Sequence, residues 1–87
     1  IVVEVPAKIN NQGIHGITLE NYPKGFGNLL NSQVGVIQLT TEAILSKSKH
    51  FAYLALLADP VVDNAIAAEK LLDNIIEKQS EFLGYLN

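Results

Sequence analysis

Hydrophobic and polar residues alternate at the start of the chain. Over the first nine residues the odd positions carry Ile, Val, Val, Ala and Ile, while Glu4 and Lys8 fall on the opposite side. A repeat of two residues is typical of a β-strand with one buried face. Pro6 lacks the N–H that a ladder needs, so it belongs at an edge, a bulge or a bend. A strand that is formed from the first residue predicts missing neighbours, and therefore a larger parent protein.

A turn and a second extended segment follow this strand. Asn10-Asn11-Gln12-Gly13 has the composition of a turn, in which Gly13 can take a positive φ. Extended character returns with the run Ile-His-Gly-Ile-Thr-Leu over residues 14–19. The two segments together predict a β-hairpin within residues 1–20.

Beyond residue 20 the apolar spacing becomes helical. Pro23, preceded by Asn21 and Tyr22, suits the first turn of a helix. Gly25 and Gly27 each weaken a helix by about 1 kcal/mol relative to alanine, so we expect a break or an irregular first turn near them. The predicted inward stripe of this helix consists of Leu30, Val34, Ile37, Thr41, Ile44 and Leu45.

Two further helices are predicted in the second half. Ser48 is the expected N-cap of a short helix from Lys49 to about Ala58, which is apolar all round and so predicted to be buried on every side. Asp63 or Asn64 is the expected N-cap of a last helix. The inward face of that helix is predicted to consist of Ala65, Ala68, Leu72, Ile75, Ile76, Gln79, Phe82 and Leu83.

These elements predict an α+β fold. The N-terminal β-hairpin of residues 1–20 is followed by a helical layer of three or four packed helices over residues 21–87. No repeat, charge run or low-complexity linker interrupts the chain, so we place no domain boundary inside it.

Composition narrows the functional classes. With 48% hydrophobic residues and a mean hydropathy of +0.21, this 87-residue chain has more apolar surface than a small core covers. This surplus predicts an interface with a partner or with a missing domain, and we expect the chain to self-associate. The longest apolar run, residues 51–58, is far below the roughly 20 residues that span a membrane. The net charge of −3 and the absence of arginine argue against nucleic-acid binding. Without cysteine, disulfides and thiolate metal ligands are excluded.

Residues with catalytic chemistry are few. A metal site would require His15 and His50 to converge with a carboxylate such as Glu4 or Glu42, and the spacing does not favour this. We expect His50 to be a surface residue. His15 follows a glycine turn, and such loops often border clefts, so it is our one candidate for a substrate cleft. No glycine-rich phosphate loop is present. The residues therefore predict no catalytic, cofactor-binding or metal-binding position in this chain.

Several segments resemble a known family in order and spacing. They are Val2-Val3-Glu4-Val5-Pro6-Ala7, Asn11-Gln12-Gly13-Ile14-His15, Gln38-Leu39-Thr40-Thr41-Glu42-Ala43-Ile44, Ala55-Leu56-Leu57-Ala58-Asp59-Pro60-Val61 and Glu81-Phe82-Leu83. The chain is similar in these segments to the C-terminal portion of glycoside hydrolase family 4. The resemblance implies part of a domain like the C-terminal domain of lactate and malate dehydrogenases.

The resemblance also implies an unusual glycosidase chemistry. Enzymes of that family use NAD and a divalent metal, usually manganese, to oxidise the sugar at C3, remove the C2 proton, eliminate the leaving group, add water and return the hydride. In the family, the nucleotide-binding domain, the metal ligands and the base all lie upstream of this portion. The resemblance therefore implies a cytoplasmic, homo-oligomeric parent enzyme, and a fragment that is inactive without its N-terminal nucleotide-binding domain.

The substrate class stays open at this level. The segment Leu57-Ala58-Asp59-Pro60 is more similar to the α-galactosidase, α-glucosidase and α-galacturonidase branches than to the 6-phospho-glucosidases of the family. A 6-phospho-glucosidase is the first alternative. A non-catalytic oligomerisation module and the C-terminal domain of a dehydrogenase are the other two.

Overall fold

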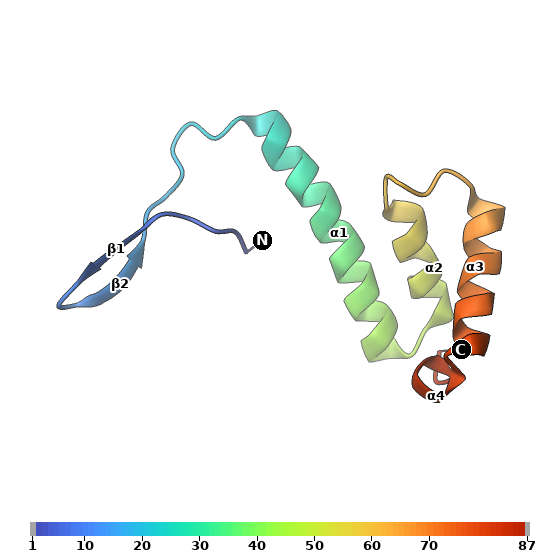
Figure 1. Ribbon diagram of the computed structural model, residues 1–87. Coiled ribbons are helices and arrows are strands. Elements are labelled where there is room, and N and C mark those ends of the chain that lie inside the picture. The colour runs from blue at the N-terminus through green and yellow to red at the C-terminus, as the bar shows by residue number, and fades with distance from the viewer. Residues whose placement is uncertain (1, 87) are drawn as a thin grey trace. The chain divides into compact units, whose positions relative to one another are not determined.

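The computed structural model describes residues 2–86 and contains two compact units, Ile1–Asn31 and Ser32–Asn87. The elements follow one another as a two-stranded hairpin and then helices (Figure 1), which confirms the predicted α+β class. Their bounds are β1 Ala7–Asn10, β2 Gly13–Gly16, α1 Lys24–Ser46, α2 Lys49–Ala58, α3 Ala65–Lys78 and α4 Ser80–Leu83.

The hairpin is shorter than the alternation predicted. The antiparallel ladder pairs Ala7 with Gly16 and Asn10 with Gly13, and Gly13 takes a φ of +119° at the turn, as its position predicted. Residues 2–6 lie outside β1, so the prediction of a strand through them is wrong, and Ile1 lies outside the described residues. The second strand likewise ends at Gly16 instead of residue 19. The chain leaves the hairpin before a longer ladder forms, and Asn21 has a φ of 57° in the loop that leads away.

Helix α1 is continuous over 23 residues, so the predicted break at Gly25 and Gly27 is wrong. The backbone N–H of Gly27 donates to the carbonyl of Pro23 at 3.1 Å, which shows that helical bonding is established in the first turn. A glycine costs helix stability without removing a hydrogen bond, and the rest of a long helix can offset this cost.

The C-terminus of α1 is closed by a Schellman motif. The N–H of Ser48 donates to the carbonyl of Ala43 at 3.0 Å, and the N–H of Lys47 donates to the carbonyl of Ile44 at 3.3 Å. Lys47 takes a φ of 55°, the left-handed conformation that this motif needs and that glycine usually supplies. The chain then passes into α2 with no further loop.

Both predicted N-caps are confirmed. The hydroxyl of Ser48 accepts from the N–H of Phe51 at the start of α2, and the side-chain oxygen of Asn64 accepts from the N–H of Ala67 at 2.9 Å at the start of α3. The last helix is nevertheless divided at Gln79, whose φ of −111° and ψ of 31° separate α3 from α4. The single long final helix that the spacing predicted is therefore two helices.

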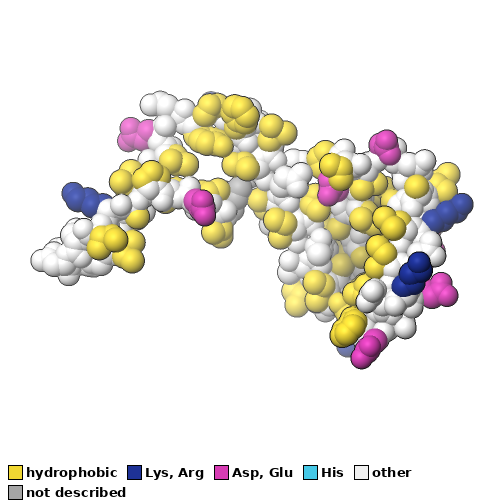
Figure 2. All heavy atoms as spheres, in the orientation of Figure 1, with side chains coloured by type: hydrophobic (Ala, Val, Ile, Leu, Met, Phe, Trp, Pro, Cys, Tyr) yellow, Lys and Arg dark blue, Asp and Glu magenta, His cyan; other side chains and the backbone are white. Residues whose placement is uncertain are grey.

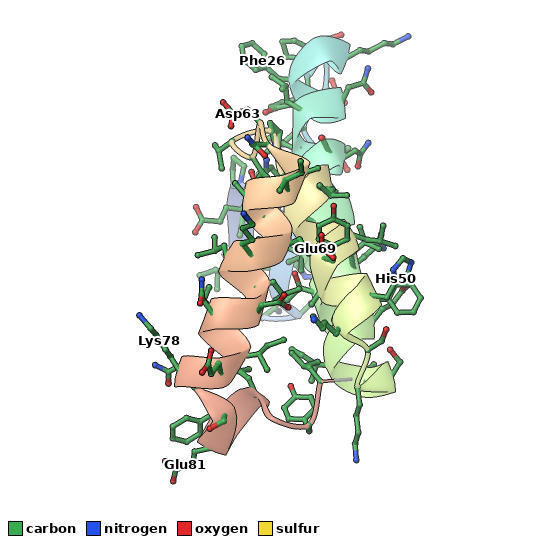
Figure 3. The ribbon with its side chains drawn as sticks, turned by 90° about the vertical axis from the view of Figure 1, so that its right-hand side faces the viewer. Phe26, His50, Asp63, Glu69, Lys78 and Glu81 are labelled. Atoms are coloured by element: carbon green, nitrogen blue, oxygen red, sulfur yellow. The ribbon has the colours of Figure 1, made fainter. Side chains whose placement is uncertain are left out.

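Helices α2 and α3 lie side by side (Figures 1 and 3). The ammonium group of Lys49 forms an ion pair with the carboxylate of Asp73 at 2.5 Å, and the hydroxyl of Tyr53 donates to the carbonyl of Ala65 at 3.4 Å. These contacts connect the first turns of α2 to α3 from outside the apolar core.

The core of the helical unit is small. Its buried hydrophobic residues in the described part of the chain are Ala43, Ala55, Ala68 and Leu72. A cavity of about 290 Å³ lies beside them and is lined by residues of all four helices and of the C-terminal tail. These residues are Thr40, Ala43, Ile44, Ala52, Leu56, Leu72, Ile75, Leu83, Tyr85 and Leu86. Alanine at three of the four buried positions permits a close approach of the helix backbones.

Several residues that were predicted to face inward are exposed. Ile37 is 65% exposed and Leu45 is 79% exposed on α1, and Ile44 and Phe82 are also more than half exposed. In α2 only Ala55 is fully buried, so burial on every side of that helix is wrong. A helical unit this small has too few neighbouring segments to cover every apolar stripe. Hydrophobic side chains accordingly reach the surface of both units (Figure 2).

None of the helices in residues 2–86 combines the length and the apolarity needed to cross a membrane.

Candidate functional site

His15, the candidate from the sequence, lies in β2 directly opposite Lys8 of β1. Both side chains are exposed. Side chains alternate between the two faces of a strand, so this pair lies on the face opposite to that of Ile9 and Ile14. Two basic side chains facing water can attract an anion, but the hairpin provides no walls around them. A role for His15 at a substrate cleft stays a prediction.

The first unit contains a hollow at another place. It has a volume of about 540 Å³ and is formed by three segments: the residues before β1, the loop after β2 and the first two turns of α1. It is lined by Val3, Glu4, Leu19, Tyr22, Gly27, Leu30 and Asn31. His15 is not among these residues.

The walls of this hollow are mainly apolar. The carboxylate of Glu4, the phenol of Tyr22 and the amide of Asn31 are its polar groups. Such groups can bind the hydroxyls of a polar ligand, since they offer both donors and acceptors. The sequence predicted Glu4 on the polar side of the first strand and Tyr22 at the start of the helix. It did not predict that these two residues lie near each other. No spacing pattern could have done so, because the loop between the hairpin and α1 sets their proximity.

His50 lies beside a second, smaller hollow in the helical unit. This hollow has a volume of about 240 Å³ and is lined by Lys49, His50, Tyr53, Glu69 and Leu72. The imidazole is exposed and points away from the helices (Figure 3), as expected for a surface residue. Its ring centroid lies 6.2 Å from that of Phe51, and the neighbouring Lys49 is paired with Asp73.

The described residues do not fit a metal ion or a dinucleotide. Within residues 2–86, no three side chains of His, Cys, Asp or Glu converge where they could hold a metal. His15 and Glu4 belong to the first unit, whereas His50 and Glu42 belong to the second. Two glycines lie in the first turn of α1, but they follow a loop and Pro23 instead of a strand, so they do not form a nucleotide-binding turn. We therefore derive no reaction step through either group in this chain.

Comparison with known proteins relates the chain to one family. Residues 1–62 match the family model described as the family 4 glycosyl hydrolase C-terminal domain. An alpha-glucosidase from Erwinia rhapontici is 42% identical over 86 residues, which cover 99% of this chain and 19% of the relative. A maltose-6'-phosphate glucosidase from Bacillus subtilis (strain 168) is 33% identical over 81 residues, covering 93% of this chain and 18% of the relative.

A third relative is the 6-phospho-alpha-glucosidase from Leptotrichia buccalis, which is 31% identical over 81 residues, covering 93% of this chain and 18% of the relative. The chain spans about a fifth of the length of the curated relatives it matches. No solved structure matches it.

Proposed function

The chain belongs to family 4 of the glycosyl hydrolases, and from this premise we propose that its parent protein is a glycosidase that hydrolyses O-glycosyl bonds with NAD and manganese. The observation that carries the proposal is the match of the family's C-terminal domain to residues 1–62, together with identity to a glucosidase that continues through the last helices. The redox-elimination route of the family is part of the proposal.

We assign this chain a structural role in that enzyme. The described residues assemble neither a metal site nor a nucleotide site, so both sites belong in this proposal to the remainder of the parent. The exposed apolar side chains of both units support a role in contacts with that remainder and between subunits of a homo-oligomer. Dependence on NAD favours a cytoplasmic location, where the cofactor is available.

For the substrate we propose an α-glucoside without a phosphate group. The higher identity to the alpha-glucosidase, 42% against 33% for the maltose-6'-phosphate glucosidase, supports this choice. The alternative is a 6-phospho-α-glucoside, and the two relatives whose names include a phosphate support it.

The full-length parent protein tests the proposal. It should release nitrophenol from p-nitrophenyl α-glucoside when NAD and Mn²⁺ are both present, and should lose this activity after removal of either by dialysis and chelation. A preference for the 6-phosphorylated substrate would select the alternative. Stoichiometric accumulation of NADH with no glycoside cleavage would instead identify a dehydrogenase, and inactivity on both glycosides would contradict the proposal.

An isotope experiment tests the route separately. Removal of the C2 proton exposes that position to solvent, so hydrolysis in D₂O should give glucose that carries deuterium at C2. Hydrolysis by a pair of carboxylates exchanges no carbon-bound proton. If the glucose carries only hydrogen at C2, the parent would still be a glycosidase, but redox elimination would be excluded.

A further inference from the structure

The backbone of β1 has one edge with no partner in the described residues. Ile17 N–H donates to the carbonyl of Pro6 at 2.8 Å, so these two residues form a hydrogen-bonded pair that continues the ladder. Hydrogen-bonded and non-hydrogen-bonded pairs alternate along an antiparallel ladder. Lys8 and Asn10 therefore direct their N–H and C=O groups toward β2, whereas Ala7 and Ile9 direct theirs away from it.

No proline interrupts this outer edge, although Lys8 places one charged side chain on the strand. Natural edge strands are often blunted by proline or charge. Pro6, however, lies on the side that faces β2, so its missing N–H does not interrupt the outer edge. Val5 and Val3, at the next alternate positions toward the N-terminus, also carry a backbone N–H.

Residues 2–6 also have a composition typical of a β-strand, although they do not form one. Three of the five are valine, a residue with high β-propensity, yet none is part of β1, and only Pro6 continues the pairing beyond it. Beside them, the apolar face of the hairpin is uncovered: Ile9 and Ile14 are opposite each other, 75% and 74% exposed. A two-stranded hairpin is at best marginally stable alone, so this one needs further strands or a helix to pack against.

We propose that a β-strand from another part of the parent chain pairs with the outer edge of residues 3–9. The occupant is a segment of the same polypeptide because this chain accounts for about a fifth of the length of its relatives, which leaves most of the parent available to supply it. A tethered segment also has an effective concentration of order millimolar, well above that of a second molecule. The hairpin is thereby the margin of a larger sheet, and Val2–Pro6 becomes a strand when that sheet is complete.

Residue-resolved hydrogen exchange on the full-length protein tests this pairing. The amides of residues 3, 5, 7 and 9 should exchange at least roughly 100-fold more slowly than unstructured peptide, like those of residues 8 and 10 that already bond to β2. Exchange of the odd-numbered amides at the unstructured rate, with residues 8 and 10 still protected, would show an open edge. Protection that disappears on dilution to dissociated subunits would identify a second copy as the occupant, and would also overturn the proposal.

A pair of proline variants gives an independent test. Ala7→Pro removes an N–H that points to the outer edge of β1 and leaves the hydrogen bonds between β1 and β2. Thr18→Pro removes an N–H in the loop that follows β2 and serves as the control. We expect the melting temperature of the full-length protein to fall by several degrees more for Ala7→Pro than for Thr18→Pro. Equal melting temperatures would contradict the pairing. If Ala7→Pro does not yield folded protein, the exchange pattern of the unsubstituted protein still decides.

Discussion

The hydroxyl oxygen of Ser48 accepts a hydrogen bond from the backbone N–H of Phe51 at 3.3 Å. The backbone N–H of the same serine closes α1 by donating to Ala43. Ser48 thus provides a hydrogen-bond partner both for a carbonyl at the end of α1 and for an N–H at the start of α2. The two helices therefore need no longer connection.

Ser48→Ala should lower the free energy of unfolding of the 87-residue chain by about 1 kcal/mol, the usual cost of an N-cap serine. The backbone bond to Ala43 persists in this variant, so the loss reports on the cap alone. Ser32→Ala, on the exposed surface within α1, is the matched control and should leave stability unchanged or slightly higher. Denaturant titration measures both, and equal effects at the two serines would disprove the capping role.

Lys47→Gly should stabilise the chain by about 0.5–1 kcal/mol. Lys47 holds a left-handed φ of 55°, which costs about 1–2 kcal/mol for a residue with a Cβ atom and much less for glycine. The control is Lys70→Gly in α3, where the same change should destabilise by about 1 kcal/mol because the site is helical. The two variants should therefore shift the denaturant midpoint in opposite directions, and shifts of the same sign would contradict the assigned conformation of Lys47.

Leu72→Ala should be the more damaging of two adjacent leucine truncations. Leu72 is 7% exposed among the helices, and truncating a buried leucine costs about 2–5 kcal/mol. Leu71 is 50% exposed, so Leu71→Ala should cost less than half as much. Thermal unfolding followed by circular dichroism compares the pair. A larger loss at Leu71 would mean that α3 packs with a different face than the structure shows.

Asp73→Asn should cost less than about 1 kcal/mol, since its ion pair with Lys49 is exposed on both sides. The cost should shrink in 1 M NaCl, where the Debye length is only about 3 Å. Glu77→Gln removes one negative charge from an exposed site on the same helix and serves as the control for net charge. A cost of several kcal/mol that salt does not reduce would indicate that the pair is buried in the folded chain.

The hairpin turn and two helix N-caps were predictable to within a residue. Gly13 at the hairpin turn and the caps Ser48 and Asn64 lie where the sequence predicted them. Each depends on hydrogen bonds or backbone angles within about four positions, so neighbouring residues carry the necessary information. The family was also predictable, because its motifs occur in the same order along the chain.

Burial and the residues of the candidate site were not predictable from the spacing of residues along the chain. Ile37 and Phe82 have the spacing of inward residues yet are exposed, while the buried positions are mostly alanine. The meeting of Glu4, Tyr22 and Asn31 around one hollow had no counterpart in any spacing pattern. These outcomes depend on which segments approach one another, and on how much of the parent protein is present to cover an apolar stripe.

The sequence by itself determined the hairpin turn, the N-caps of α2 and α3, the α+β class and the family, since these depend on short-range preferences and on the order of motifs. Only the tertiary structure decided which apolar side chains are buried, that the last helix divides at Gln79, and that Pro6 faces β2 and so leaves the outer edge of the hairpin open. The physical reason is that a local hydrogen bond needs only its neighbours, whereas burial and edge exposure depend on contacts between segments that are distant along the chain.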